Sequence, residues 1–259
     1  MKILVLGGGE LGVQVCRLAA AAGIQTIVMD RRANCPASAS AGEFLCADPA
    51  DAAARPAADY IVPATDDDAV MQSLAGENVL HDAAAWAVAS SRFASDEFLR
   101  AQGIAIPEYF PDGSEPYITK PDRGSFGQGV WVTEDFCEVG GAVNSGYVAQ
   151  EELAGDVWSQ AVLRRGGSTK VYPAAKLTRG DRYIRTAAAC EAAPDADSLR
   201  AAAQKIAEAL DLNGILEIEA IYNRGCWKVV DLNARIPMLT PDAVLAAGAG
   251  NMLADLCEK

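Results

Sequence analysis

The chain has 259 residues, of which 51% are hydrophobic and 22% are charged, and its formal net charge is −13. These values are typical of a folded globular protein and exclude a disordered or fibrous chain, and no apolar run reaches the length of a membrane span. The strong negative charge repels phosphate backbones and anionic lipid surfaces, so neither nucleic acid nor membrane is an expected partner.

The cysteines and the histidine limit the chemistry further. Seven cysteines are dispersed without a Cys-x-x-Cys pair, and no secretory signal is recognised, which predicts reduced thiols in a cytoplasmic protein. The single histidine, His81, is expected at a strand end and turn as a surface or capping residue. A Ser-His-Asp triad is the less favoured alternative, so the chemistry should not depend on imidazole.

The first 88 residues alternate between strand and helix patterns. An apolar run at 3–6 is followed by a glycine-rich turn at 7–12 and by a helical pattern that stops at Gly23. Strand patterns at 26–30 and 59–63 then predict a parallel sheet with helices packed on it. The apolar face of the first helix is expected to be Leu11, Val15, Leu18 and Ala22.

Beyond residue 88 the pattern changes. A helix at about 92–102 precedes short strand patterns separated by Gly- and Pro-containing turns, which is typical of antiparallel hairpins. A later amphipathic helix has Leu199, Ala203, Ile206 and Leu210 on one face. The expected strands are 117–120, 129–133, 147–150, 158–163, 215–222 and 226–233.

The last hairpin carries the most informative side chains. Because side chains alternate along a strand, Glu217 and Glu219 share one face of the first strand. Asp231 and Asn233 share one face of the second, and Arg235 follows. Clustered carboxylates need a compensating cation or proton, and oxygen ligands without His or Cys favour Mg²⁺. A solvated sheet face is the alternative interpretation.

The segment 120–130, KPDRGSFGQGV, is the second candidate. Lys120 ends a strand, and a glycine-rich loop leads into the next one. Glycines let backbone N–H groups approach phosphates closely, and Lys120 supplies a compact positive charge. The GxxxxGK[ST] order and the following helix of a P-loop are absent, and an ordinary glycine-rich hairpin turn is the alternative.

Residues 7–12, GGGELG, satisfy the GxGxxG pattern between a strand and a helix, and Asp30 ends the next strand. In a dinucleotide-binding enzyme an acid at that place binds ribose, so this segment alone favours a nicotinamide-dependent oxidoreductase. The rest of the chain lacks an obvious partner domain for hydride transfer, so this interpretation is kept as an alternative.

Taken in order, these segments resemble the ATP-grasp superfamily. Its pattern is an α/β domain, a Lys-Pro pair with a glycine-rich flap, a Gln/Glu-Glu hinge, an acidic strand and a D/E-x-N-x-R strand. The corresponding segments here are 7–12, 120–129, 150–155 (QEELAG), Glu219 and 231–235 (DLNAR).

Within the superfamily the chain is most similar to the 3-methylornithine–L-lysine ligases of pyrrolysine biosynthesis, and less so to the carboxyaminoimidazole ribonucleotide synthetases. The resemblance implies an α/β ATP-grasp fold. A parallel-sheet pre-ATP-grasp domain at 1–88 would precede two α+β subdomains with antiparallel sheets, at 89–149 with the flap and at 150–259 with the Mg²⁺ and ATP site. It also implies a segment after Lys259, so a truncated chain or a compact variant is expected.

The resemblance assigns roles by position. The implied catalytic residues are Lys120 and Arg235, and the implied Mg²⁺ ligands are Glu219, Asp231 and Asn233. Arg92 stands where the family usually has a phosphate-binding lysine. The implied ATP-binding residues are Arg92, Lys120, Ser125, Gly127, Gln150, Glu151, Glu152, Leu153, Asp156 and Arg185, and the implied substrate-binding residues are Glu10, Leu11, Asp30, Asp66, Arg235 and Thr240.

The implied reaction uses ATP and Mg²⁺. A substrate carboxylate attacks the γ-phosphate to form an acyl phosphate, and an amine then displaces phosphate to give an amide. The implied substrates are 3-methyl-D-ornithine and the ε-amine of L-lysine, whose ammonium groups could pair with Asp30 and Asp66. A non-catalytic nucleotide-binding module is a third interpretation. The sequence leaves the oligomeric state open.

Overall fold

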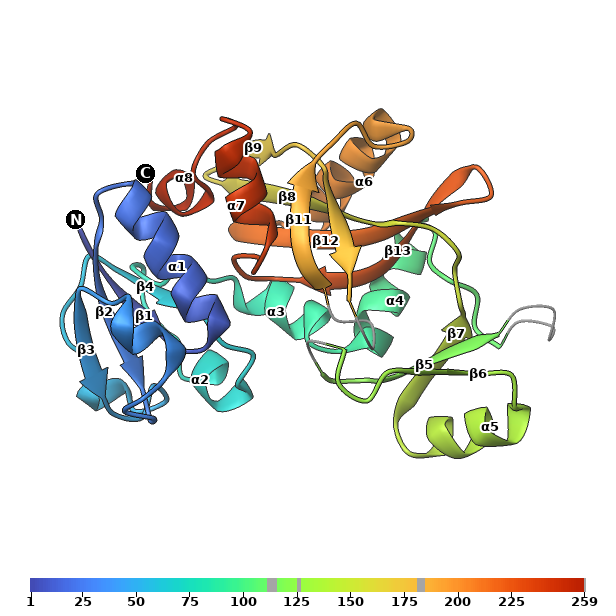
Figure 1. Cartoon of the computed structure of the whole chain (residues 1–259), viewed down its shortest axis with the longest axis horizontal. Coiled ribbons are helices and arrows are strands. Elements are labelled where there is room, and N and C mark those ends of the chain that lie inside the picture. Colours follow the sequence, from blue (N-terminus) through green and yellow to red (C-terminus); the bar gives the residue numbers. More distant parts are fainter. Residues whose placement is uncertain (111–115, 125–126, 181–184, 259) are drawn as a thin grey trace.

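The computed structural model describes residues 1–110, 116–124, 127–180 and 185–258, and the side chains of Arg179 and Arg185 fall outside that description. Figure 1 shows a parallel sheet formed by the N-terminal part of the chain, a small antiparallel sheet from its middle, and a larger antiparallel sheet. This order of sheets, and the mixed α/β class, are those predicted.

Within the described ranges, the chain forms both helices and strands. The helices are α1 (Glu10–Ala21), α2 (Asp68–Gln72), α3 (Ala83–Ala89), α4 (Arg92–Ala101), α5 (Phe136–Asn144), α6 (Ala196–Ala209), α7 (Thr240–Ala246) and α8 (Met252–Cys257), with 3₁₀ turns at Pro36–Ala39 and Ala52–Ala54. The strands are β1 (Lys2–Leu6), β2 (Gln25–Asp30), β3 (Glu43–Cys46), β4 (Tyr60–Pro63), β5 (Tyr117–Pro121), β6 (Trp131–Thr133), β7 (Tyr147–Glu151), β8 (Val157–Arg165), β9 (Ser168–Val171), β10 (Ala175–Arg179), β11 (Arg185–Cys190), β12 (Gly214–Asn223) and β13 (Cys226–Asn233).

The first sheet has the order β3-β2-β1-β4, and its neighbouring strands are parallel. Helix α1 packs on it with Leu11, Val15 and Leu18 buried. The prediction is wrong for Ala22, which is an exposed C-cap because the helix ends one residue earlier. Since parallel strands end at the same edge, the turns after β1, β2 and β4 lie close together, at the edge where such sheets bind ligands.

The largest sheet has the order β11-β10-β8-β12-β13, with β9 paired to β8, and its pairings are antiparallel. Helix α6 packs against β8 and β9. Its residues Leu199, Ala203 and Ile206 are fully buried, as their spacing predicts, and Leu210 packs against the same core. Helices α3 and α4 contact β13, so they connect the first domain to this sheet.

A β-bulge interrupts β13 where it pairs with β12. Glu219 pairs with Asp231, but the next residue of β12 pairs with Val229, so Val230 is the extra residue. Val229 and Leu232 both belong to the buried core on one side of the sheet, whereas Val230 and Asp231 both line the cavity on the other.

The small sheet has the order β6-β5-β7 and is antiparallel. Helix α5 packs on it through the fully buried Val139. The sequence patterns did not predict this helix, because Gly140 and Gly141 within it lower its intrinsic propensity. In Figure 1, α3 and α4 lie between this sheet and the parallel sheet.

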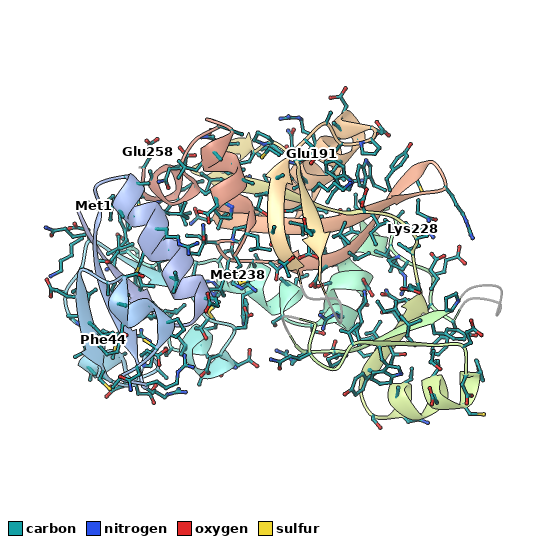
Figure 2. All side chains as sticks on the ribbon, viewed as in Figure 1. Met1, Phe44, Glu191, Lys228, Met238 and Glu258 are labelled. Atoms are coloured by element: carbon teal, nitrogen blue, oxygen red, sulfur yellow. The ribbon has the colours of Figure 1, made fainter. Side chains whose placement is uncertain are left out.

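The two ends of the described chain lie on the same side of the molecule. Helix α8 packs against α1, and Figure 1 shows both termini beside the parallel sheet. Figure 2 places Met238, which follows β13, where the parallel-sheet domain meets the rest of the chain. None of the helices in the described ranges is long and apolar enough to cross a membrane.

Candidate active site

A cavity of about 280 Å³ lies where the three sheets meet. Its walls come from the turn after β4, from α3 and the start of α4, from β5 and β7, and from the β12–β13 hairpin. The folded chain therefore gathers here segments that are distant in sequence. The predicted site residues that line the cavity are Asp66, Arg92, Lys120, Gly127, Glu151, Glu152, Leu153, Glu219, Asp231, Asn233 and Arg235.

The β12–β13 hairpin supplies the acidic wall of the cavity. Glu217 pairs with Asn233, Glu219 pairs with Asp231, and all of these residues line the cavity. The register thus gathers the side chains in the way their alternation along the strands predicts, because the bulge at Val230 lies beyond both pairs. A solvated sheet face does not fit Glu217, which is only 5% exposed.

The Glu217 carboxylate is held by donors on both of its oxygens. Oε1 accepts hydrogen bonds from Ser159 Oγ at 2.6 Å and Thr240 Oγ1 at 2.7 Å, and Oε2 accepts one from Asn233 Nδ2 at 3.3 Å. Thr240 is fully buried, so this residue, predicted to bind substrate, contacts the site through Glu217. Because the Asn233 amide nitrogen faces Glu217, its Oδ1 is the atom that can serve a cation.

Lys120 is the central cation of the opposite wall. Its Nζ lies 3.4 Å from Gln150 Oε1 and 3.5 Å from the carbonyl oxygen of Val230, the bulge residue. Lys120 is 8% exposed. Its burial, and then the positive charge of Arg92, lower the pKa of Lys120 to about 8.

Arg92 is held beside Lys120 by the start of α4. Ser91 caps the helix by accepting a hydrogen bond from the Ala94 amide at 3.2 Å. The Arg92 guanidinium donates to the Pro121 carbonyl at 2.6 Å and the Gly124 carbonyl at 3.2 Å, and its Nη2 lies 3.9 Å from Asp231 Oδ2. Its Nε is buried without a hydrogen-bond partner among the described residues, so a donor remains for an anion.

Arg235 joins the last strand to the first domain. Its Nε donates to Asp66 Oδ1 at 2.6 Å and its Nη2 to Asp66 Oδ2 at 3.1 Å, which is a bidentate pair. The Arg235 side chain is 8% exposed and that of Asp66 24%. Both predicted substrate-binding residues therefore lie in the cavity, with one edge of the guanidinium bound to the acid.

The predicted hinge lies at the end of β7. The Glu151 carboxylate is buried, forms an ion pair with Lys228, and accepts a hydrogen bond from the Glu108 amide at 2.9 Å. The Glu152 amide donates to the Pro116 carbonyl at 2.8 Å. Any backbone contact to a base would therefore rest on the Glu152 carbonyl and the Leu153 amide.

An apolar surface continues the cavity from the hinge. It consists of Leu153, Val157, Leu177 and Ile221, which pack together as one buried cluster and line the cavity. An apolar wall next to backbone donors and acceptors suits a flat heteroaromatic ring. Leu153 was predicted from the hinge motif, but Val157, Leu177 and Ile221 carry no functional group and stand in no recognised motif, which is why the sequence patterns did not indicate them.

Of the other predicted residues, Glu10, Leu11 and Asp156 do not line the cavity. Glu10 is exposed at the first turn of α1, and the Leu11 side chain is buried in the core of the first domain. Asp156 forms an ion pair with Lys176 at 2.7 Å. Ser125 and the side chain of Arg185 lie outside the described residues.

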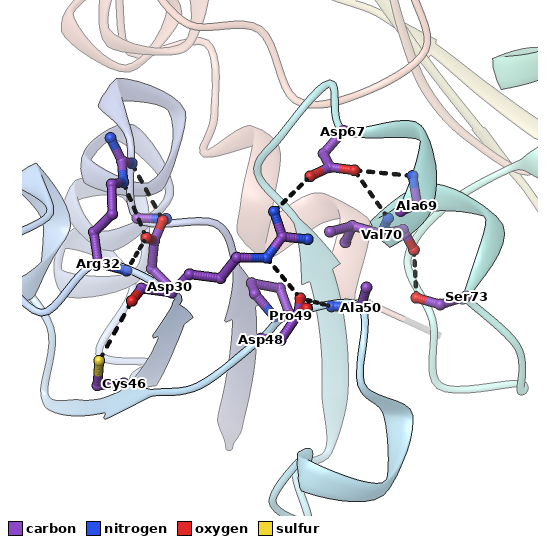
Figure 3. Close-up of polar contacts among 12 residues, drawn as sticks. Asp30, Arg32, Cys46, Asp48, Pro49, Ala50, Asp67, Ala69, Val70 and Ser73 are labelled. Atoms are coloured by element: carbon purple, nitrogen blue, oxygen red, sulfur yellow. Dashed lines mark hydrogen bonds and ion pairs between the residues drawn. The ribbon is translucent and has the colours of Figure 1, made fainter.

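Asp30 holds the glycine-rich turn of the first domain (Figure 3). Its Oδ2 accepts a hydrogen bond from the Gly8 amide at 2.7 Å, and its carboxylate also binds the amide and guanidinium of Arg32. Burial raises the pKa of Asp30, but these hydrogen bonds outweigh it and leave the pKa below its usual value. The carboxylate is thus engaged by its own domain, which disfavours the ribose-binding role of the oxidoreductase interpretation.

Packing or backbone conformation explains Gly7, Gly8 and Gly12 of this turn, whereas a Cβ on Gly9 would have no neighbour within 4 Å. A Cβ on Gly8 would lie 2.2 Å from Cys35 Sγ, and one on Gly12 would lie 2.4 Å from the Gly7 carbonyl oxygen. Gly7 itself has a φ of 107°, which favours glycine. The close helix–strand turn therefore accounts for two of the three glycines of the GxGxxG pattern, Gly7 and Gly12, without a dinucleotide.

The sequence patterns missed several residues of the site. Trp86 lines the cavity from α3, and Asp68 and Arg123 form an ion pair at 3.3 Å between the first domain and the segment after β5. Asp96 is buried next to Gln150 and Tyr109. Asp96 follows Arg92 by four positions, and side chains with that spacing lie on the same face of a helix. This spacing was the one sequence signal that could have indicated Asp96.

His81 departs from the predicted surface or capping role. Both of its ring nitrogens are buried without a hydrogen-bond partner in the described part of the chain. Its ring packs edge-on against Trp86 with the centroids 6.1 Å apart. Burial lowers the pKa of His81, so the neutral imidazole acts as an apolar support behind a cavity residue.

The donor set fits a magnesium-bound triphosphate better than a self-sufficient metal centre. Across the described ranges, no group of three or more His, Cys, Asp or Glu residues could hold a metal ion. The predicted ligands are two carboxylates and an amide, and Mg²⁺ typically takes one or two carboxylates and completes its shell with phosphate oxygens and water. Lys120 and the unpartnered Arg92 Nε supply positive charge for the phosphates.

Comparisons with known proteins agree with this arrangement. A family model described as the ribonucleotide synthetase preATP-grasp domain matches residues 1–90, and one described as the ATP-grasp domain matches residues 89–238. The 3-methyl-D-ornithine–L-lysine ligase of Methanosarcina acetivorans is 26% identical, over 98% of this chain and 72% of its own length. The N5-carboxyaminoimidazole ribonucleotide synthase of Brucella melitensis is 25% identical, over 83% of this chain and 68% of its own length.

A solved structure shares the fold. The N5-carboxyaminoimidazole synthetase from Staphylococcus aureus, complexed with ADP, matches with a TM-score of 0.76 at 20% identity, over 91% of this chain and 70% of its own. The ATP-grasp model alone spans more than half of the chain. The chain therefore belongs to the ATP-grasp family and is an ATP-dependent carboxylate–amine ligase.

Proposed function

We propose that the protein joins 3-methyl-D-ornithine to the ε-amine of L-lysine, using ATP and Mg²⁺ and passing through an acyl phosphate. One observation carries the proposal: the acidic β12–β13 hairpin and the buried cations Lys120 and Arg92 face one cavity. A cavity that carries carboxylates on one wall and cations on the other suits a ligand that brings both metal and phosphate charge.

The phosphate end of the site would be formed by Lys120 and Arg92. Each is more than four-fifths buried, so the interaction with phosphate oxygens is little screened by water. The adenine would lie against the apolar wall of Leu153, Val157, Leu177 and Ile221. This arrangement would orient the γ-phosphate toward the hairpin and Arg235.

Glu219, Asp231 and Asn233 would hold the metal. Bound Mg²⁺ supplies charge neutralisation of the β- and γ-phosphate oxygens. Glu217 is engaged by Ser159, Thr240 and Asn233, so we assign it to orienting Asn233 rather than to ligation.

The chemistry would then proceed by positioning. A carboxylate oxygen of the first substrate attacks the γ-phosphorus, the bond to the β-phosphate bridge breaks, and ADP leaves. The amine nitrogen of the second substrate attacks the acyl carbon, and phosphate leaves as that nitrogen loses a proton. Arg235 would stabilise the negative charge that develops on the transferred phosphoryl group and on the acyl phosphate.

The substrate assignment rests on similarity and charge. The relative from Methanosarcina acetivorans, which is named for these substrates, aligns with almost the whole chain at 26% identity. The cavity also carries Asp66 and Asp68 at the first domain, and carboxylates suit the ammonium groups of diamino acids. An ammonium would share these carboxylates with Arg235 and Arg123, which pair with Asp66 and Asp68 in the free protein. Asp30 would take part only if Arg32 moved from it, because Arg32 and Gly8 occupy both of its oxygens.

The proposal is tested by ATP consumption across pairs of diamino acids, with the product masses recorded. A condensed product of 3-methyl-D-ornithine and lysine is the expected result. Asp231→Ala should abolish turnover, whereas the matched substitution at the exposed Asp197 on α6 should not. ATP binding without amino-acid-dependent phosphate release would instead favour a non-catalytic module, and consumption dependent on a ribonucleotide would favour the synthase-like alternative.

A further inference from the structure

The buried carboxylate of Asp96 lies behind Lys120, the lysine proposed to bind phosphate, with the side chain of Gln150 between them. Asp96 Oδ2 accepts a hydrogen bond from Gln150 Nε2 at 2.8 Å, and Gln150 Oε1 in turn faces Lys120 Nζ at 3.4 Å. Asp96, Gln150 and Lys120 are all less than 9% exposed. They come from α4, β7 and β5, so a helix and two adjacent strands meet in this chain of contacts.

The two ends of the chain determine how the Gln150 amide is oriented. An ionised carboxylate only accepts hydrogen bonds, and an ammonium only donates them. A glutamine between the two therefore satisfies both only with its nitrogen toward Asp96 and its oxygen toward Lys120. Without a group at position 96 that only accepts hydrogen bonds, the Gln150 amide could reverse or lose this orientation.

The orientation of the Gln150 amide matters because burying the positive charge of Lys120 costs free energy. Arg92 repels it from the same wall, and burial already lowers its pKa. Its ammonium group contacts the Gln150 oxygen and the Val230 carbonyl. Losing one of them would leave the ammonium free to turn away from the position at which it meets a phosphate.

We infer that Asp96 is a positioning residue for ATP: through Gln150, it holds the Lys120 ammonium aimed into the phosphate end of the cavity. The inference rests on the proposed ATP site and goes beyond it by assigning a role to a residue that touches no substrate. Tyr109 holds the other side of the arrangement, since its hydroxyl donates to the same Asp96 oxygen at 2.7 Å.

The test compares ATP affinity with amino-acid kinetics in Asp96→Asn, which keeps the shape of the side chain and removes its charge and its strict acceptor character. The Kd for Mg-ATP, measured by calorimetry on the whole chain, should rise about tenfold, as expected when one charge-assisted hydrogen bond is weakened. The KM values for the amino-acid substrates should change by less than about twofold. A merely structural defect would shift both sets of constants.

A double-mutant cycle shows whether the effect passes through Gln150. Gln150→Leu alone should weaken ATP binding by a similar factor, and Asp96→Asn added to it should cause little further loss. Tyr109→Phe is the control, because it removes a hydroxyl from Asp96 but leaves the contact to Gln150 in place.

The outcomes separate the two proposals. Wild-type protein that fails to bind Mg-ATP would overturn the proposed function. If the wild type binds Mg-ATP and Asp96→Asn binds it equally well, only the positioning role is overturned. The role is also overturned if Tyr109→Phe reproduces the whole loss, or if the losses at Asp96 and Gln150 are additive.

Discussion

Asp66 and Arg235 are separated by 169 positions in the chain, yet they form a bidentate ion pair with distances of 2.6 and 3.1 Å. Asp66 follows β4 of the parallel sheet, and Arg235 follows the last strand of the large sheet. The pair therefore fixes the arginine proposed for the transition state relative to the domain proposed to bind the amino acids. It also means that a change in the first domain can alter the direction of the side chain that we propose to be catalytic.

The first prediction concerns this pair. Asp66→Asn should lower kcat by about tenfold or more, because a neutral amide holds the guanidinium less firmly and one misplaced charge costs about 1–3 kcal/mol. Steady-state kinetics at saturating ATP measure this effect. Asp197→Asn, an exposed substitution on α6, is the control and should leave kcat unchanged. Equal kcat values for the two variants would contradict the role given to Asp66.

The second prediction concerns His81 and acid stability. The imidazole is buried and neutral in the folded chain, with a lowered pKa, whereas in the unfolded chain it titrates near 6.5. As the pH falls, His81 is therefore protonated at a higher pH in the unfolded chain than in the folded chain. The contribution of His81 to stability should be fully present above about pH 6.5 and should fall as the pH drops toward the folded pKa, by up to about 1.4 kcal/mol per pH unit.

Urea denaturation of the wild type and of His81→Phe between pH 7.5 and pH 5 checks this dependence. The variant keeps an aromatic ring against Trp86 and removes the titrating group. As the pH falls, the free energy of unfolding of the wild type should therefore decrease relative to that of His81→Phe. A pH-independent difference would show that the imidazole is not buried as described. Because the chain has one histidine, its ring resonances can also be followed without assignment.

The third prediction concerns Lys120. Its pKa is lowered to about 8, first by burial and then by Arg92. The ammonium form is the one that attracts phosphate, so kcat/KM for ATP should decline as the pH rises through about 8 in the free enzyme. Lys120→Arg should have lower activity but lose this decline, because a guanidinium stays charged throughout the range. A decline that persists in the arginine variant would have to be assigned to another group.

The fourth prediction concerns the support of Glu217. Thr240→Val removes a fully buried hydroxyl that donates to Glu217 at 2.7 Å, and leaves the carboxylate with fewer donors. The free energy of unfolding should fall by about 1–3 kcal/mol. The control is Thr186→Val on an exposed position of β11, which should change stability by less than about 0.5 kcal/mol. Chemical denaturation of both variants measures the contrast, and similar losses would contradict the buried network.

Much of the fold could be predicted because regular alternation is a local property. In β12, alternate residues from Glu217 to Ile221 line the cavity, as simple alternation predicts, because no extra residue interrupts that strand. The same reasoning placed Asp231 and Asn233 together because both lie on one side of the bulge. Helix α5 escaped prediction because tertiary packing of Val139 overrides the two glycines in its segment.

The parts of the site that could not be predicted depend on contacts between distant segments. Asp96 meets Gln150 only after α4 packs beside the small sheet, and their sequence separation of 54 gives no periodic signal. His81 sits next to Asp82, which caps α3, so its segment resembles an ordinary surface turn. The burial of its ring depends on Trp86, and one sequence does not reveal that contact.

The extra residue in β13 has a consequence for how the strand can change. Trp227 and Val229 face the core before it, and Leu232 and Ala234 face the core after it, so the inward positions are out of phase across Val230. A strictly alternating strand could bury all of these apolar side chains only if it were one residue shorter at this point. Deleting Val230 would therefore bring these core positions into one alternating series, with Asp231 and Asn233 still on the opposite face, but it would remove the bulge whose carbonyl Lys120 contacts, whereas replacing the Val230 side chain would keep that carbonyl.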